Sequence, residues 1–111
     1  DGTATREFLY VEDAAAAIVT AVLHPTPLNR YVNICSGEEI PIKRLVEETC
    51  TILEYPGDLR WDATKPNGQP RRQFSNVAAA VNLAWHPKTT FQEGLRGTVA
   101  AMLLSHGEET R

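Results

Sequence analysis

Short apolar runs and helically spaced apolar positions alternate along this chain. Residues 7–11 and 31–35 are rich in aromatic and β-branched side chains, which is typical of β-strands. Residues 59–62 alternate between apolar and polar side chains and predict a third strand. Because segments with helical spacing follow these runs, the pattern indicates a mixed α/β protein.

The first predicted helix follows directly on the first strand. It is rich in alanine, runs from Asp13 to Leu23 and has apolar side chains on nearly every side. A helix that is apolar all round is expected to be buried. Asp13 is the expected N-cap, because its carboxylate is able to accept the unpaired N–H groups of the first turn.

Two further helices are predicted in the middle of the chain. Apolar positions recur at helical spacing over residues 42–53, and Pro41 suits the first helical position because it has no N–H to satisfy. A short helix ending at Leu83 has Ser75 or Asn76 as its cap.

The last predicted helix begins with a capping-box sequence. Thr90 stands at the cap and Glu93 follows three residues later. Three short strands and four helices in 111 residues predict one small domain, residues 1–111, of α/β or mixed α+β type. A sheet this small often packs against a larger partner domain.

The most basic segment lies between Arg60 and Arg72. It holds four basic residues and one acidic residue, whereas the whole chain has a net charge of −3. Residues 65–71 (KPNGQPR) place cations around two prolines and a glycine, which makes a stiff, exposed loop. One interpretation is a site for a phosphate-bearing small molecule. The other is a solvated turn with ordinary surface charges, and charge alone favours this second interpretation.

Composition narrows the class of protein. The negative net charge argues against a nucleic-acid partner, which needs a broad basic face. No secretory signal and no apolar run of membrane-spanning length is visible, so we expect no membrane partner. Cys35 and Cys50 lack the spacing of a metal site. We expect two reduced thiols in a cytoplasmic protein, with Cys35 buried, and the alternative is one disulfide between them.

Motifs of catalysis and cofactor binding are absent from this sequence. It contains no glycine-rich dinucleotide loop, P-loop, GxSxG or HExxH. His24, His86 and His106 lie far apart, each near a predicted helix end, and are expected to be ordinary surface or helix-terminal residues. Trp61 and Trp85 are expected to anchor the core. We therefore predict no catalytic residue, no metal site and no cofactor site within this chain.

Four segments together resemble one protein family. In chain order they are TREFLYVEDAAAAIV, YVNICSGEEIPIKRL, LRWDATKPNGQPRR and LAWHPKTTFQEGLRGTV. They resemble the C-terminal part of extended short-chain dehydrogenases/reductases, the NAD(P)-dependent nucleotide-sugar epimerase/dehydratase family. The KPNGQPRR loop is the most specific of the four. The resemblance implies a Rossmann-type enzyme whose N-terminal lobe binds NADP(H) through a glycine-rich loop and carries a YxxxK pair, and neither motif occurs here.

Three residues carry the substrate site that the resemblance implies, with a nucleotide-diphosphate sugar, expected to be a GDP-sugar, as the ligand. Arg6 matches the arginine of the family's REF strand, which reaches the nucleotide or its diphosphate. Lys65 matches the lysine of the family's KPDG loop, which faces the nucleotide. Arg71 matches the arginine after the second proline. A guanidinium grips two phosphate oxygens at once, whereas an ammonium acts as a point charge.

Three positions depart from the family pattern. Asn67 and Ser75 stand where the family usually has Asp, and Ala84 replaces the glycine before Trp85. A non-glycine residue is uncomfortable at the left-handed end of a helix, so Ala84 is expected to be strained. These departures bear on the exact substrate more than on the fold.

Two functions remain open. In the first, the chain is the GDP-sugar-binding portion of an NADP(H)-dependent epimerase/reductase and is not catalytic alone. In the second, it is a non-catalytic interaction or structural module. Surfaces that face an absent lobe would be apolar, so the second hypothesis predicts self-association into a homo-oligomer.

Overall fold

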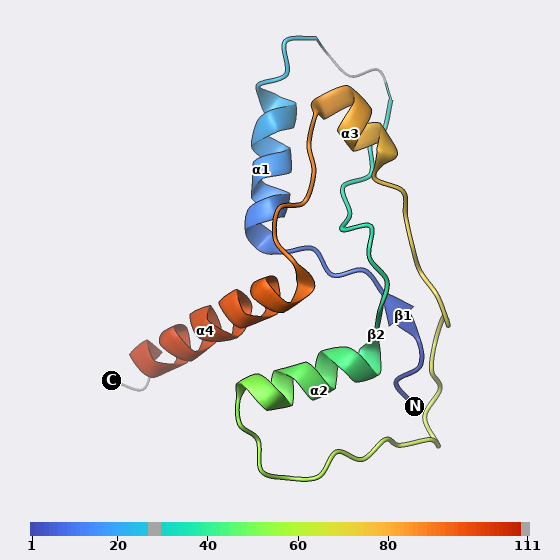
Figure 1. The fold of residues 1–111 in the computed structure, drawn as a ribbon, viewed down its shortest axis with the longest axis vertical. Coiled ribbons are helices and arrows are strands. Elements are labelled where there is room, and N and C mark those ends of the chain that lie inside the picture. The colour runs from blue at the N-terminus through green and yellow to red at the C-terminus, as the bar shows by residue number, and fades with distance from the viewer. Residues whose placement is uncertain (27–29, 110–111) are drawn as a thin grey trace.

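The computed structural model describes residues 1–26 and 30–109. This part of the chain contains four helices and two short strands, joined by segments without regular structure (Figure 1). In chain order they are β1 (Thr5–Arg6), α1 (Val11–Val22), β2 (Ile40–Pro41), α2 (Ile42–Ile52), α3 (Val77–Leu83) and α4 (Phe91–Glu109). The mixed α/β composition that the sequence predicts is confirmed. None of the described helices combines the length and apolar character that a bilayer span requires.

The two strands bring the N-terminal segment, the start of α2 and the basic loop together. β1 pairs antiparallel with β2, in the register Thr5–Pro41 and Arg6–Ile40. On the other side of β1, Thr5 forms a parallel bridge with Arg71, and its N–H donates to the carbonyl of residue 70 at 2.9 Å. The loop is therefore held at the edge of the strand that carries Arg6.

A long arm without helix or named strand connects α2 to α3. It runs from residue 53 to residue 76 and passes around the outside of the molecule (Figure 1). Residues 53–75 of this arm are all exposed. Among them is Trp61, 37% exposed, whose ring lies over Gly2, so the prediction that Trp61 anchors the core is wrong.

The main core lies between α1 and α3. Its buried side chains are Ala17, Ala79, Leu83 and Trp85. The indole Nε1 of Trp85 donates to the backbone carbonyl of Asp13 at 3.1 Å, which ties the segment after α3 to the first turn of α1. Trp85 is thus a core anchor, as the sequence predicts.

A second packing zone joins α2 and α4 to the segment before α1. The rings of Phe8 and Phe91 lie 5.8 Å apart, and the Arg44 guanidinium stacks over Phe91 at 5.1 Å. Tyr10 lies against Gly94 and Gly97 in α4. A Cβ at Gly97 would stand 2.7 Å from the Tyr10 hydroxyl, so a larger residue there would force the end of the Tyr10 side chain to move.

The predicted strands at residues 7–11, 31–35 and 59–62 are wrong. These segments carry no strand in the structure, because no neighbouring strand lies beside them to accept their hydrogen bonds. The short β1–β2 pair forms just before and after the first two of them. Strand propensity describes how well a side chain fits a sheet surface, and here the sheet is too small to provide one.

The first helix differs from its prediction in two respects. α1 begins at Val11 with Tyr10 as its N-cap, so Asp13 lies within the first turn and is not the cap. Its carboxylate is instead buried and accepts the N–H groups of Lys88 and Thr89 at 3.2 and 3.0 Å. The expectation that the helix is buried all round is also wrong, since Ile18 is 65% exposed. Nothing in the described chain packs on that side of α1.

The other three helices follow the sequence closely. α3 ends at Leu83, as predicted. α2 begins at Ile42 with Pro41 as its extended N-cap, so the prediction that Pro41 is the first helical residue is wrong by one position. At the start of α4, the Glu93 N–H donates to the Thr90 hydroxyl at 3.2 Å, as expected for a capping box. These helices form as predicted because helical spacing and the capping box of α4 are local signals, whereas the N-caps of α2 and α3 form no side-chain capping hydrogen bond.

Candidate anion-binding site

Arg6 lies beside the basic loop. A Cβ on Gly68 would stand 4.0 Å from the Nη2 atom of Arg6, and the Nη1 atom donates to the carbonyl of Thr5 at 2.6 Å. Gly68 itself has φ +73°, a left-handed conformation that favours glycine at the tip of this loop. Within the described residues, no carboxylate forms an ion pair with Arg6. Its charge is therefore available to a ligand.

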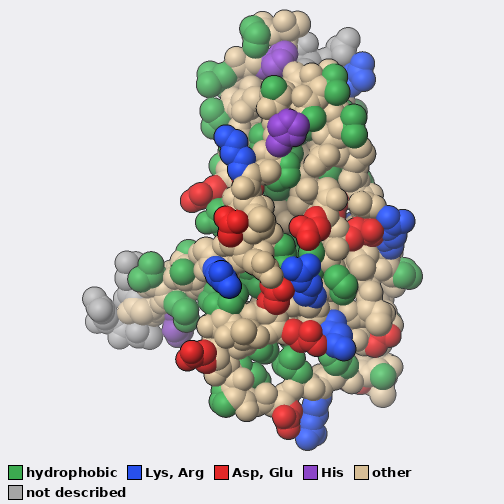
Figure 2. Space-filling view, viewed as in Figure 1, with side chains coloured by type: hydrophobic (Ala, Val, Ile, Leu, Met, Phe, Trp, Pro, Cys, Tyr) green, Lys and Arg blue, Asp and Glu red, His purple; other side chains and the backbone are tan. Residues whose placement is uncertain are grey.

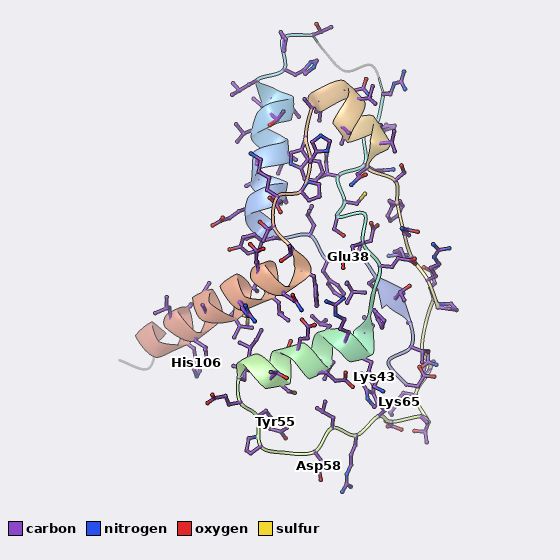
Figure 3. All side chains as sticks on the ribbon, in the orientation of Figure 1. Glu38, Lys43, Tyr55, Asp58, Lys65 and His106 are labelled. Carbon is purple, nitrogen blue, oxygen red and sulfur yellow. The ribbon has the colours of Figure 1, made fainter. Side chains whose placement is uncertain are left out.

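Lys65 lies at the start of the loop. Its N–H donates to the carbonyl of Asp62 at 3.2 Å, and the Asp62 carboxylate accepts the N–H of Thr64 at 3.0 Å. The hydrogen bonds from Thr64 hold the pKa of the Asp62 carboxyl below its usual value. The Lys65 ammonium has no ion-pair partner in the described part of the chain. Figure 3 shows Lys65 in the corner of the molecule where α2 begins.

Arg71 is already paired. Its Nε atom donates to the Glu39 carboxylate at 2.5 Å, and its Nη2 atom donates to Gln73 Oε1 at 2.6 Å. The same Glu39 oxygen accepts the Thr5 hydroxyl at 3.1 Å. This contact with Arg71 lowers the pKa of the Glu39 carboxyl and raises the pKa of the guanidinium.

The three predicted site residues thus differ in whether a carboxylate pairs with them. The backbones of Arg6 and Arg71 are brought together by Thr5, which precedes one and bridges to the other. No carboxylate of residues 1–26 or 30–109 forms an ion pair with Arg6 or Lys65, whereas the charge of Arg71 is directed at Glu39. Successive side chains of a strand point to opposite faces, and this separates the Thr5–Glu39–Arg71 contacts from Arg6.

Glu7 is a residue that reasoning from the sequence missed. One carboxylate oxygen accepts the Gly37 N–H at 2.7 Å, and the other accepts the Phe74 N–H at 2.8 Å. A single side chain next to Arg6 therefore fixes both the turn before β2 and the end of the arm. The available signal was an acidic residue at the start of an otherwise apolar segment.

Cys35 lies beside this Glu7 junction. It is 7% exposed, and its thiol donates to the carbonyl of Phe74 at 3.5 Å. Burial is the main cause that raises the pKa of this thiol, and the nearby Glu7 carboxylate adds to it. The prediction of a buried structural thiol is confirmed, and both Cys35 and Cys50 are free.

Two hollows flank the segment after β1. One, of about 340 Å³, lies between residues 7–10, α2 and α4 and is lined mainly by aromatic and aliphatic side chains. The other, of about 380 Å³, is shallow and lies at Gly37 and residues 73–76. Neither is lined by Arg6, Lys65 or Arg71, so the cations of the loop lie on an open surface. Among the described residues, no group of His, Cys, Asp and Glu side chains is placed to hold a metal ion.

Comparison with known proteins identifies the family. Residues 1–35, which include β1 and α1, match the model of the NAD dependent epimerase/dehydratase family. The chain is 39% identical over 94 residues to GDP-L-fucose synthase of Sinorhizobium fredii, covering 85% of this chain and 29% of that protein. The chain thus spans about three tenths of the length of this relative.

Solved structures agree with the sequence relatives. RMD from Pseudomonas aeruginosa, complexed with NADPH, aligns with 86% of this chain and 32% of its own, at 27% identity and a TM-score of 0.76. WbmF of Bordetella bronchiseptica, in complex with NAD⁺ and UDP, aligns with 97% of this chain and 33% of its own, at 27% identity and a TM-score of 0.75. The chain belongs to the NAD dependent epimerase/dehydratase family and corresponds to about three tenths of proteins such as GDP-L-fucose synthase.

Proposed function

We propose that this chain is the nucleotide-sugar-binding, C-terminal portion of an NAD(P)-dependent epimerase/reductase and that its ligand is a GDP-sugar. The observation that carries the proposal is the position of Arg6 and Lys65 at one proline-flanked loop, each without a carboxylate counter-ion in the described residues. Cations that are unpaired and held by a stiff loop suit a diphosphate. The GDP moiety is inferred from the similarity to GDP-L-fucose synthase.

The two cations have different parts in this proposal. The planar guanidinium of Arg6 grips two oxygens of the diphosphate, while the Lys65 ammonium adds a point charge beside it. Arg71 does not contact the ligand directly. It holds the end of the loop against β1 through Glu39 and thereby keeps Lys65 and Arg6 within reach of one ligand. Binding and orientation are the whole contribution of the chain to catalysis.

The cofactor belongs to residues outside this chain. RMD, which is similar in structure, was solved with NADPH, so NADP(H) chemistry is expected of the complete enzyme. A dinucleotide needs a glycine-rich loop at a helix start, and this sequence has none. The residues present therefore do not fit a cofactor site, and we assign no hydride or proton transfer to them.

Calorimetric titration with GDP tests the proposal. An open surface binds weakly because affinity needs enclosure as well as charge. We expect Arg6→Ala and Lys65→Ala each to weaken binding at least about tenfold, since each removes a charge-assisted contact worth about 1.5 kcal/mol or more. Lys88→Ala, which removes an exposed lysine distant in sequence from the loop, is the matched control and should leave binding unchanged. Unchanged affinity in both loop variants, or no binding by the folded wild-type chain, would contradict the proposal.

A self-associating module is the second candidate function. Its supporting observation is the number of large apolar side chains that are exposed, including Val22 at 77% and Leu23 at 75%. Exposed apolar side chains mark sites of association where they form a contiguous patch. This candidate requires no ligand, so it predicts a concentration-dependent homo-oligomer and no effect of GDP.

A further inference from the structure

Asn67 and Gly68 form the tip of the basic loop. Both residues are exposed, and residues 66–69 have no regular structure. The two prolines that flank the tip restrict their own backbone and that of the residue before each, which leaves Asn67 and Gly68 the least restricted residues between them. Exposed loop tips are where folded chains are preferentially cleaved, because the backbone there is accessible. The same accessibility opens this dipeptide to a reaction between its own two residues.

The backbone nitrogen of Gly68 and the side-chain amide of Asn67 are both accessible. The Gly68 N–H donates to no acceptor among residues 1–26 and 30–109. A Cβ at Gly68 would meet only the Nη2 atom of Arg6, 4.0 Å away, so glycine leaves open space beside this nitrogen. The Asn67 Oδ1 atom accepts a hydrogen bond from the amino group of Asp1 at 2.7 Å. A donor on an amide oxygen stabilises the negative charge that develops there when the amide carbon is attacked.

The other asparagines of the sequence lack such a neighbour. Each is followed by a large residue, whose side chain crowds the backbone nitrogen that would have to react; these asparagines are Asn29, Asn33, Asn76 and Asn82. The Asn82 side chain is also held inside α3, where its Nδ2 atom donates to the carbonyl of Ala78 at 2.8 Å. Asn67–Gly68 is therefore the asparagine position at which sequence and structure both favour reaction.

We propose that Asn67–Gly68 is a site of spontaneous covalent modification, which converts the side-chain amide into a carboxylate through a cyclic imide. The Gly68 nitrogen loses its proton and forms a bond to the Asn67 Cγ atom. The bond from Cγ to the side-chain nitrogen breaks, and this nitrogen takes up the proton and leaves as ammonia. Water then opens the succinimide ring at either carbonyl and gives an aspartyl or an isoaspartyl residue. The reaction needs water alone, with no enzyme and no oxidant.

The modification changes the loop that carries Lys65, and its effect on binding rests on the proposed function. The isoaspartyl product lengthens the main chain between Lys65 and the hydrogen bond that ties residue 70 to Thr5, so Lys65 shifts relative to Arg6. The aspartyl product keeps the main-chain length. Figure 2 shows acidic and basic side chains interspersed over the half of the molecule that holds α2 and α4, so on this face no block of one sign outweighs a new charge at the loop.

Timed incubation of the folded chain in mildly alkaline buffer tests the modification without any nucleotide. Trypsin releases residues 61–71 as one peptide, because a proline follows Lys65, and fragment masses locate the replacement of NH₂ by OH. We expect the folded chain to react within about threefold of the rate of a synthetic 61–71 peptide, because the loop imposes little restraint. Gly68→Ala should react at least about tenfold more slowly, since a Cβ crowds the nitrogen. Asn76 and Asn82 are internal controls and should stay intact.

Two results would overturn the inference: a folded chain that reacts at least about tenfold more slowly than the free peptide, or equal reaction at Asn76. Binding is compared separately, between Asn67→Asp and a chain with isoaspartate at position 67, made by joining synthetic segments at Cys50. We expect the isoaspartyl chain to bind GDP at least about tenfold more weakly, and equal affinities would contradict its effect on the site. If no chain binds GDP, the proposed function fails, whereas the masses still decide the modification.

Discussion

Single residues decide how the site is held together, and Glu7 is the clearest case. A carboxylate only accepts hydrogen bonds, and both of its oxygens are used here, by the N–H groups of Gly37 and Phe74. Glu7→Gln replaces one acceptor by a donor that faces another donor. We expect it to lower the free energy of unfolding by about 1–3 kcal/mol, measured by urea denaturation. Glu12→Gln, at an exposed acid of α1, is the control, and equal effects of the two would contradict this role.

Ala84 is the other residue whose conformation has a measurable consequence. It ends α3 in the left-handed region, with φ 52° and ψ 33°, where a Cβ atom is unfavourable. The strain expected from the family's glycine at this position is thus visible in the backbone. Ala84→Gly should raise the free energy of unfolding by about 1 kcal/mol.

Ala80→Gly provides the matched comparison for this prediction. It makes the same chemical change inside α3, where glycine costs about 1 kcal/mol. Chemical denaturation of the two variants should therefore give shifts of opposite sign. Two destabilised variants would show that Ala84 is not strained.

At the scale of elements, the hold of the basic loop on β1 depends on pH. The Glu39 carboxyl has a lowered pKa because Arg71 donates a hydrogen bond to it. Because the pKa of Glu39 is lower in the folded state, its ionised carboxylate stabilises the fold. This stabilisation is complete above the ordinary pKa of a glutamate and is lost as the pH falls through the lowered pKa. We expect the Arg71–Glu39 contact to be lost only at acidic pH, below the ordinary range of a glutamate, while the backbone hydrogen bond from Thr5 to residue 70 does not titrate.

Nuclear magnetic resonance checks this prediction directly. The Nε–H signal of Arg71 should move with pH in the acidic range and stay constant near neutrality. Glu39→Gln should remove that titration, whereas Glu47→Gln, which alters an exposed ion pair in α2, should keep it. A titration that persists without Glu39 would assign the effect to another acid.

The helices of this chain could be predicted from the sequence, whereas the strands could not. Helices α2, α3 and α4 were predictable because helical spacing and the Thr–Glu capping box of α4 are local signals, although Pro41 is the N-cap of α2 and not its first residue. The strands were not predictable, because a strand exists only when a neighbour accepts its hydrogen bonds. The ion pair of Arg71 was equally unpredictable, because Glu39 is 32 residues away in sequence and was interpreted as part of an acidic turn.

At the scale of the whole molecule, the chain is open. Its radius of gyration is 17.1 Å, whereas a compact domain of this length has about 13 Å. It measures 52 × 40 × 20 Å, so it is a slab with little interior. The sequence predicted that α1 would be buried, because apolar residues such as Ile18 and Val22 lie on the side that the structure leaves exposed. The apolar pattern indicates a helix with little polar surface, and among the described residues nothing packs on the exposed side of α1.

The proposed role of the chain follows from the same picture. An open slab with Arg6 on β1 and Lys65 on a stiff loop, neither paired with a carboxylate of the described residues, binds one part of a ligand, and the remaining enclosure must come from elsewhere. The account therefore predicts measurable but weak recognition of a diphosphate by the isolated chain.

Comparing GDP with guanosine is the most direct measurement of this claim. The two ligands share the base and ribose and differ in the diphosphate that Arg6 and Lys65 are proposed to bind. The account predicts that the wild-type chain binds GDP at least about tenfold more tightly than guanosine, and that the Arg6→Ala/Lys65→Ala double variant binds both equally. Equal affinities in the wild-type chain, or a preference for GDP that survives in the double variant, would contradict it.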